Sequence, residues 1–87
     1  MYVICTYDVK SKNCPKFMKL LRRYLFHVQE SVFEGELTPS KYKKMKSELD
    51  KIISKEDNVM LYFSYNSKMI KRKELGKKVK NNIIIID

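Results

Sequence analysis

The sequence is poor in the residue types that build metal centres and disulfide frameworks. Its 87 residues include two cysteines, Cys5 and Cys14, and a single histidine, His27. Two thiols without a CxxC spacing cannot form a disulfide-dense scaffold. A structural zinc usually takes four nitrogen or sulfur ligands, which is more than these side chains supply. We therefore expect reduced thiols, with Cys5 as a small buried hydrophobe, in a cytoplasmic protein.

Glycine, proline and long apolar runs are also scarce. Two glycines and two prolines exclude a collagen-like or low-complexity chain. No apolar run approaches the roughly 18 residues that cross a bilayer, and Met1–Cys5 lacks the basic region of a signal peptide. With 44% hydrophobic residues, the chain has enough apolar surface to fold. We expect residues 1–87 to form one domain that does not enter a membrane.

Positive charge is what the sequence has in excess. Nineteen Lys or Arg residues against ten Asp or Glu residues give a formal net charge of +9. Cations that neutralise phosphates give affinity for nucleic acid without sequence preference, and no motif for reading bases is present. The candidate phosphate contacts lie near the first predicted helix and in a C-terminal cluster: Lys10, Lys12, Lys16, Arg22, Arg23, Lys71, Arg72, Lys73, Lys77 and Lys78.

Continuous β-branched and aromatic runs predict the strands. Residues 2–7, 59–63 and 83–86 are such runs. Residues 68–80 are rich in lysine and indicate an edge strand or a loop. Residues 27–36 alternate as a strand does, and this pattern permits either one bent strand or a tight hairpin, with Gly35 as a bulge or turn.

Two helices are predicted between these strands. Asn13 is placed to cap the first, whose apolar stripe has helical spacing: Phe17, Leu20, Leu21, Tyr24 and Leu25. Thr38 and Pro39 form a helix-start signal for the second, whose stripe is Tyr42, Met45, Leu49, Ile52 and Ile53. Strands alternating with helices predict an α/β sandwich.

The strand composition also predicts a dimer. Three strand segments are apolar at consecutive positions, so both faces of the sheet require burial. Two helices cover only one face of a small sheet, and a second copy of the chain would cover the other. Residues 83–86 form a terminal strand that is suited to adding to the partner's sheet.

Two segments carry a family resemblance. Tyr7-Asp8-Val9 closes the first strand, and residues 28–38 read VQESVFEGELT. With Gly76 and the Ile-rich last strand, the chain resembles the family of small CRISPR-associated adaptation proteins, the endoribonuclease-like dimeric partners of the CRISPR integrase. This family often has arginines just after the Asp motif, where the present chain has lysines, which lack the bidentate guanidinium fork.

The resemblance implies a fold, a site and a role. The fold is α+β, a ferredoxin-like β-α-β-β-α-β sandwich with a tight central hairpin and an extra C-terminal strand, about residues 83–87, on the partner's sheet. The site is Asp8, which would be both the metal ligand and the catalytic residue, with Mg²⁺ shared between the two protomers of a homodimer. The role is spacer acquisition in antiviral defence, as a DNA-binding bridge for the integrase, with nuclease activity on RNA or DNA in some members.

Other interpretations of these residues stay open at the level of sequence. Asp8 at a strand end can cap the turn at residues 10–13 instead of holding a metal. Tyr7, Ser31 and Phe33 either line a cleft near Asp8 or serve as packing and local pairing. The alternative functions are a toxin-like metal-dependent endoribonuclease and a plain basic RNA-binding module.

Overall fold

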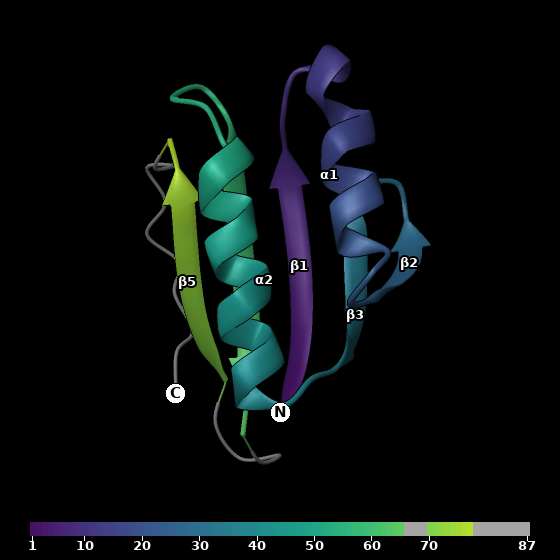
Figure 1. Cartoon of the computed structure of the whole chain (residues 1–87), viewed down its shortest axis with the longest axis vertical. Helices are drawn as coiled ribbons and strands as arrows, with labels where there is room; N and C mark the ends of the chain where they lie inside the picture. The colour runs from purple at the N-terminus through teal and green to yellow at the C-terminus, as the bar shows by residue number, and fades with distance from the viewer. Residues whose placement is uncertain (66–69, 78–87) are drawn as a thin grey trace.

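An antiparallel sheet carries two helices in the computed structural model, which describes residues 1–65 and 70–77 (Figure 1). The elements follow the chain as β1 (Tyr2–Asp8), a 3₁₀ turn η1 (Ser11–Asn13), α1 (Cys14–Leu21), β2 (Phe26–Gln29), β3 (Val32–Glu36), α2 (Pro39–Ile52), β4 (Asn58–Ser64) and β5 (Lys71–Gly76). This is the expected β-α-β-β-α-β order followed by one further strand.

The strand order in the sheet is β2-β3-β1-β4-β5, so β1 lies at the centre between β3 and β4. The central hairpin is confirmed: β2 and β3 are joined by Glu30 and Ser31, and Glu30 has a φ of 27°. The strand after β4 is Lys71–Gly76, within the stretch for which an edge strand or a loop was expected. The predicted strand at residues 83–87 lies outside the described residues.

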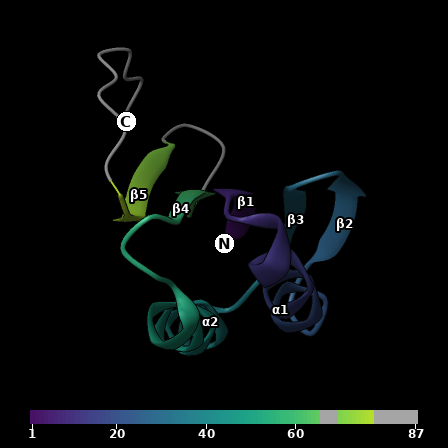
Figure 2. The same cartoon turned by 90° about the horizontal axis from the view of Figure 1, so that it is seen from above.

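Both helices lie on one face of the sheet (Figure 2). The strands turn alternate residues to that face, and in β1 these are Val3, Cys5 and Tyr7, which are buried. They contact the apolar stripes of the helices, including Phe17, Leu20 and Leu21 of α1 and Tyr42, Met45 and Leu49 of α2. Burial raises the pKa of the Cys5 thiol to about 12, in line with its predicted role as a buried hydrophobe.

The opposite face of the sheet carries a second apolar row. Ile4 of β1 pairs with Tyr62 of β4, and Thr6 pairs with Met60. These four side chains are half-buried. Within residues 1–65 and 70–77 no helix covers this face (Figure 2). The consecutive apolar positions of the strands therefore have one face in the core and one face open.

The first helix differs in detail from its prediction. Asn13 stands at the N-cap, but its side chain makes no capping hydrogen bond. The helix ends at Leu21, so Tyr24 and Leu25 follow it in a turn, where the Leu25 N–H donates to the Leu21 carbonyl at 2.8 Å. Leu25 is nevertheless buried, because the turn directs it back over the sheet. The apolar spacing of the sequence extends beyond the end of the helix because Leu25 packs in the core from the turn that follows α1.

Gly35 also has a different place from the one expected. It lies inside β3, paired with Val3, and the hairpin turn is at Glu30 instead. A Cβ atom at Gly35 would lie 3.2 Å from Leu25 Cδ2, so close packing explains the glycine. The start of α2 is confirmed, since Thr38 Oγ1 accepts a hydrogen bond from the Lys41 N–H at 3.1 Å.

Candidate metal and nucleic-acid site

Asp8 is the last residue of β1 and lies where three strands meet the loops. It pairs with Asn58, the first residue of β4, which in turn pairs with Gly76, the last residue of β5. The Asp8 side chain is exposed, and among the described residues it has no hydrogen bond or ion pair. The turn after β1 is closed by the Asn13 N–H, which donates to the Lys10 carbonyl at 2.8 Å. Asp8 does not cap this turn, so its carboxylate is free for a cation.

Two pockets adjoin Asp8. The first, the Ser31 pocket, has a volume of about 330 Å³ and is lined by Tyr7, Asp8, Val9, Cys14, Met18, Glu30 and Ser31. The second, the Lys10 pocket, has a volume of about 260 Å³ and is lined by Asp8, Val9, Lys10, Glu56, Asn58 and Lys77. Asp8 is thus the acidic side chain that both pockets share.

In the Ser31 pocket, Tyr7 and Ser31 have different roles. Tyr7 is buried and stacks on Phe17 with ring centroids 5.7 Å apart, and Phe33 lies 6.2 Å away. Burial raises the pKa of the Tyr7 hydroxyl. The Ser31 carbonyl accepts the Tyr7 N–H at 3.2 Å, which holds the hairpin turn beside Asp8. Tyr7 and Phe33 therefore belong to the core, and Ser31 belongs to the pocket wall.

His27 is held away from both pockets. Its ring stacks on Phe33 at 4.6 Å, and its Nε2 lies 2.6 Å from the Glu30 carbonyl oxygen. It does not line either pocket beside Asp8. The imidazole stabilises the hairpin and is not placed to act as a base for a substrate at Asp8.

In the Lys10 pocket, opposite charges from distant segments meet. Lys10 Nζ lies 2.5 Å from Glu56 Oε1, and both side chains are more than half exposed. The hydrogen bond from Lys10 holds the pKa of Glu56 below its usual range, and the charge of Lys77 acts in the same direction. The Glu56 contact likewise raises the pKa of Lys10.

Sequence reasoning missed Glu56 and Asn58. Both lie just before the strand predicted at residues 59–63, and nothing in the linear pattern places them beside Asp8. The register of β1 against β4 does so, by pairing Asp8 with Asn58.

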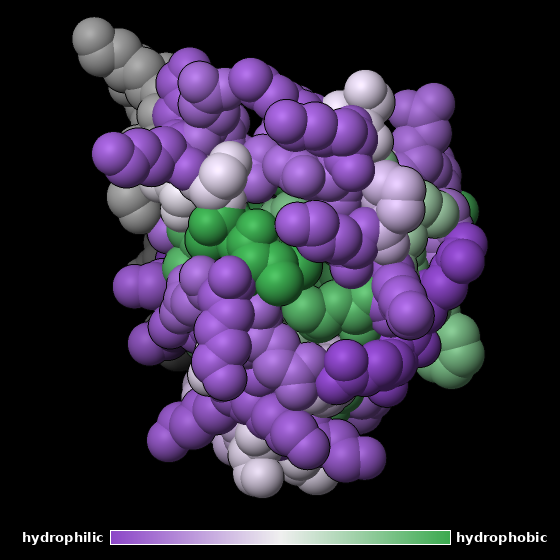
Figure 3. Space-filling view, turned by 45° about the horizontal axis from the view of Figure 1, so that its top comes forward, coloured by the Kyte–Doolittle hydropathy of each residue, from purple (hydrophilic) through white to green (hydrophobic). Residues whose placement is uncertain are grey.

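Four of the predicted phosphate contacts come from four segments at the end of the sheet where Asp8 lies. Lys10 follows β1, Lys12 lies in η1 and Lys16 lies in α1, and all three are exposed. Lys77 follows β5 and reaches the same end of the sheet. Figure 3, which turns this end toward the reader, shows hydrophilic side chains over most of the surface around an apolar patch. This end of the molecule therefore carries exposed cations beside Asp8.

The remaining basic residues are distributed elsewhere. Arg22 and Arg23 lie at the far end of α1, where Arg23 is committed to an ion pair with Glu48 at 2.6 Å. On β5, Lys71 and Lys73 pair with Phe63 and Leu61, whereas Arg72 pairs with Tyr62. Successive strand residues face opposite ways, so these three cations do not form one patch. Lys78 lies outside the described residues.

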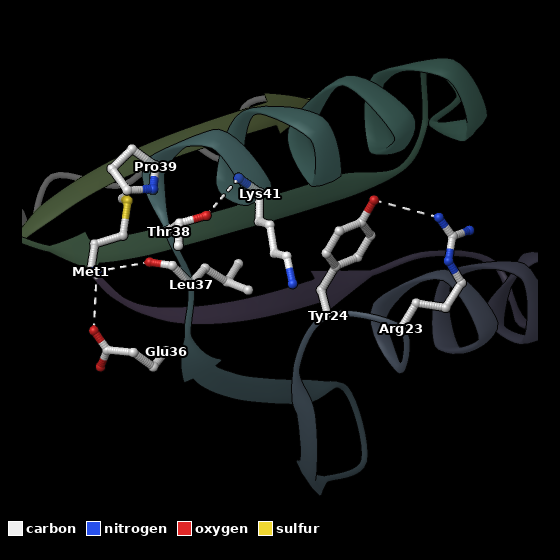
Figure 4. A pocket seen from close by; sticks show the side chains of 8 residues that line it. All are labelled: Met1, Arg23, Tyr24, Glu36, Leu37, Thr38, Pro39 and Lys41. Carbon is white, nitrogen blue, oxygen red and sulfur yellow. Dashed lines mark hydrogen bonds and ion pairs between the residues drawn. The ribbon is translucent and has the colours of Figure 1, made fainter.

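A more voluminous pocket, of about 470 Å³, lies at the opposite end of β1 (Figure 4). There the Met1 amino group donates to the Leu37 carbonyl at 2.8 Å and pairs with Glu36 at 3.1 Å. Lys41 and Arg23 contribute positive charge to its wall. Most of the polar groups drawn in Figure 4 form hydrogen bonds or ion pairs with one another. The smaller pockets beside the Asp8 carboxylate are therefore the better candidates for a functional site.

Comparison with known proteins identifies the family. The family model described as CRISPR associated protein Cas2 matches residues 1–73. This chain belongs to the Cas2 family. It is 47% identical over 77 residues to the "CRISPR-associated endoribonuclease Cas2" of Thermotoga maritima, covering 87% of this chain and 88% of that protein. It is 38% identical over 86 residues to the "CRISPR-associated endoribonuclease Cas2 3" of Thermodesulfovibrio yellowstonii, covering 95% and 98%.

A solved structure supports the same assignment. A chain titled "Crystal structure of cas2" superposes with a TM-score of 0.69 at 31% sequence identity, covering 100% of the present chain and 98% of that one. The ferredoxin-like fold and the family resemblance are therefore both confirmed. Membership of the Cas2 family favours a CRISPR role over a plain RNA-binding module. Among the described residues, no helix is long and apolar enough to cross a membrane.

Proposed function

We propose that this protein is a homodimeric, nucleic-acid-binding bridge that works with a CRISPR integrase in spacer acquisition. The observation that carries the proposal is the Cas2 family match over residues 1–73. The charge supports it, because a dimer doubles the formal net charge to +18, twice the +9 of one chain. Such a charge binds phosphate backbones of DNA, and of RNA as a second class, without reading bases.

The open face of the sheet supports the homodimer. Ile4, Met60 and Tyr62 form a half-buried apolar row with no helix over it in the described part of the chain. Apolar surface removed from water contributes about 25 cal/mol per Å². A two-fold pairing of identical faces would bury this row and bring two basic surfaces into one particle.

Asp8 supports a divalent-metal site, with Mg²⁺ as the expected ion. Its carboxylate is exposed and has no partner among residues 1–65 and 70–77, and hard cations bind carboxylate oxygens. The described residues contain no group of three or more His, Cys, Asp or Glu side chains suited to a metal. The chain fits Mg²⁺ only as a one-carboxylate ligand, with a second carboxylate supplied by the symmetric protomer and with water or phosphate filling the remaining positions. A bound ion would activate water and offset charge on a phosphoryl group.

A second candidate function is endonuclease activity at the same residue. The relatives described above are named endoribonucleases, which favours RNA as the substrate. In this function Asp8 is catalytic and holds the metal, while Lys10 and Lys12 hold the phosphate backbone beside it. The neighbourhood of Asp8 provides no histidine base, so the chain itself contributes orientation and charge rather than a proton acceptor.

Asp8→Asn separates these two functions. The substitution keeps the size of the side chain and removes its charge, so metal binding should weaken. The metal-free dimer should be equally or more stable, because like charges at the two-fold axis no longer repel each other. If the metal drives hydrolysis, RNA cleavage should fall by orders of magnitude. If the protein is chiefly a bridge, integration of spacers with the partner integrase should be retained. We expect integration to survive, because contacts between lysines and phosphates do not need the carboxylate.

Asp50→Asn is the matched control. Asp50 is an exposed carboxylate on α2, so this variant loses the same charge without touching the Asp8 pockets. It should leave metal binding, cleavage and integration unchanged. Loss of integration in Asp8→Asn, with the dimer and its DNA affinity intact, would overturn the bridge and favour the catalytic role.

A further inference from the structure

The Lys10 pocket contains a carboxylate of the protein itself, that of Glu56. Glu56 lies on the loop before β4 and places its carboxylate on Lys10 Nζ at 2.5 Å, and Lys77 lines the same pocket from the end of β5. Lys10 and Lys77 are 67 positions apart in the sequence (77 minus 10) and line this pocket from separate segments. Lys10 contacts the Glu56 carboxylate, whereas Lys77 acts on it through its charge. Two lysines that line one pocket can also bind a phosphate, whose oxygens accept charge-assisted hydrogen bonds from ammonium groups.

The position of Lys77 is built into the fold. Its N–H donates to the Asp57 carbonyl at 2.6 Å, and its own carbonyl accepts from Asn58 Nδ2 at 2.7 Å. Asn58 is 9% exposed. Gly76 makes this course possible with a φ of +82°, since a Cβ atom there would lie 2.1 Å from the Asp57 carbonyl oxygen. The backbone that carries Lys77 is therefore held beside Asp8 by a buried amide and a left-handed glycine.

The Glu56 contact is exchangeable. The Lys10 and Glu56 side chains are 59% and 65% exposed, and ion pairs at such exposure contribute little to stability. With Glu56 in place, the two lysines of the pocket face two carboxylates, Glu56 and Asp8. Once Glu56 moves away, the pocket has an excess of positive charge next to Asp8.

We propose that Lys10 and Lys77 form a phosphate subsite next to Asp8, which the Glu56 carboxylate occupies in the free protein and which a backbone phosphate of nucleic acid takes over on binding. This inference rests on the proposed nucleic-acid function and adds its regulation. Glu56 competes with the phosphate for Lys10, so it weakens binding to this end of the molecule. Asn58 is a positioning residue for Lys77.

Glu56→Gln tests the competition. The amide keeps the shape of the side chain and loses its charge, so affinity for a labelled single-stranded RNA and for a labelled duplex DNA should rise about two- to fivefold at low salt, the range expected for an exposed ion pair. Fluorescence anisotropy over a salt series measures the affinity and its salt dependence. Circular dichroism checks that each variant is folded.

Glu36→Gln is the matched control. Glu36 is an exposed glutamate that also has an ion pair, but it lies at the opposite end of the sheet, beside Met1. It changes the net charge by the same amount, so any gain beyond its effect belongs to the pocket. Lys10→Gln should lower the salt slope by about one, the value for one lost phosphate contact. In the Lys10→Gln background, Glu56→Gln should give no more gain than Glu36→Gln does.

The outcomes distinguish the subsite from the function it rests on. The subsite is overturned if Glu56→Gln and Glu36→Gln change the affinity equally, or if the gain from Glu56→Gln persists in full in the Lys10→Gln background. In either case, nucleic-acid binding by the unmodified protein still supports the proposed function. Failure of the unmodified protein to bind either nucleic acid at low salt overturns both.

Discussion

Gly76 shows how one residue holds the Asp8 end of the sheet together. Its φ of +82° lies in the left-handed region, which side chains with a Cβ atom adopt only with strain. It also lies directly against the Asp57 carbonyl. The chain can therefore turn at the end of β5 and place Lys77 beside Asn58. Both the positive φ and the close contact with the Asp57 carbonyl favour glycine at this position.

We predict that Gly76→Ala lowers the free energy of unfolding by about 1–3 kcal/mol, the usual cost of a strained backbone. The added methyl group would meet backbone at 2.1 Å, so relaxation must move the chain and not merely a side chain. Urea denaturation at one fixed protein concentration measures the change.

Gly35→Ala is the comparison for that prediction. Its Cβ atom would lie 3.2 Å from the end of the Leu25 side chain, and its φ is not left-handed. The gain from lower unfolded-state entropy offsets part of the crowding, so stability should change by no more than about 1 kcal/mol. If Gly35→Ala proves the more damaging of the two, the account of Gly76 is wrong.

At the scale of elements, a polar contact joins the two helices. Arg23, just after α1, pairs with Glu48 of α2 at 2.6 Å, and the Tyr24 hydroxyl donates to the same carboxylate at 3.0 Å. Burial alone would raise the pKa of Glu48, but the Tyr24 hydrogen bond and the Arg23 charge outweigh it and lower the pKa. The contact ties the end of α1 to α2 across the helix layer.

We predict a pH-dependent effect of Glu48→Gln. A carboxyl group whose pKa is lowered by folding stabilises the folded state above its ordinary pKa of 4.5, and this contribution is lost as the pH falls through the folded-state value. The variant should be less stable than the unmodified protein at neutral pH, and the difference should vanish in acid. Thermal unfolding over a pH series measures it.

The Asp50→Asn control should behave differently. Asp50 has only a long contact, 3.9 Å, to Lys46 on its own helix. Its substitution should shift the unfolding temperature less than Glu48→Gln does at neutral pH. A Glu48→Gln effect that stays constant down to strongly acid pH would contradict the role of the ionised carboxylate.

At the scale of the whole molecule, the sheet has one face in the core and, within the part of the chain that the structure describes, one face that no helix covers. The two helices cover one face of the sheet (Figure 2). Val3 and Cys5 are buried on that face, whereas Ile4 and Tyr62 are half-buried on the other. A chain of this size buries only about 60–65% of its unfolded surface. This open face is the surface that the proposed second copy would cover.

We predict that Ile4→Glu converts the proposed dimer into a monomer. A charge in the middle of the open face would be desolvated by the partner without a counter-charge, which is costly. Analytical ultracentrifugation at micromolar concentration measures the change. Ser47→Glu, on the exposed surface of α2, adds the same charge and should leave the dimer intact. A well-folded monomer of the unmodified protein would refute the dimer itself.

Much of the fold is determined locally. Strand and helix content follow from side-chain periodicity, since β1 buries alternate residues and α2 begins at Thr38-Pro39 as its capping chemistry requires. The family resemblance added the hairpin, which alternation alone left undecided. The position of Asp8 at the end of a strand could also be predicted from the sequence, because a polar residue directly after an apolar run marks the end of a strand.

Only the tertiary structure decided which residues meet Asp8. Glu56, Asn58 and Lys77 reach it through the register of β1 with β4 and of β4 with β5. Periodicity states which face a side chain takes, but not which distant strand lies next to it. The structure also shows that Lys71, Arg72 and Lys73 lie on a strand, for which the sequence left a loop as the alternative, and the pleat of that strand turns Arg72 away from the two lysines. The charges of the chain are determined by its sequence, whereas their neighbours depend on long-range pairing between strands.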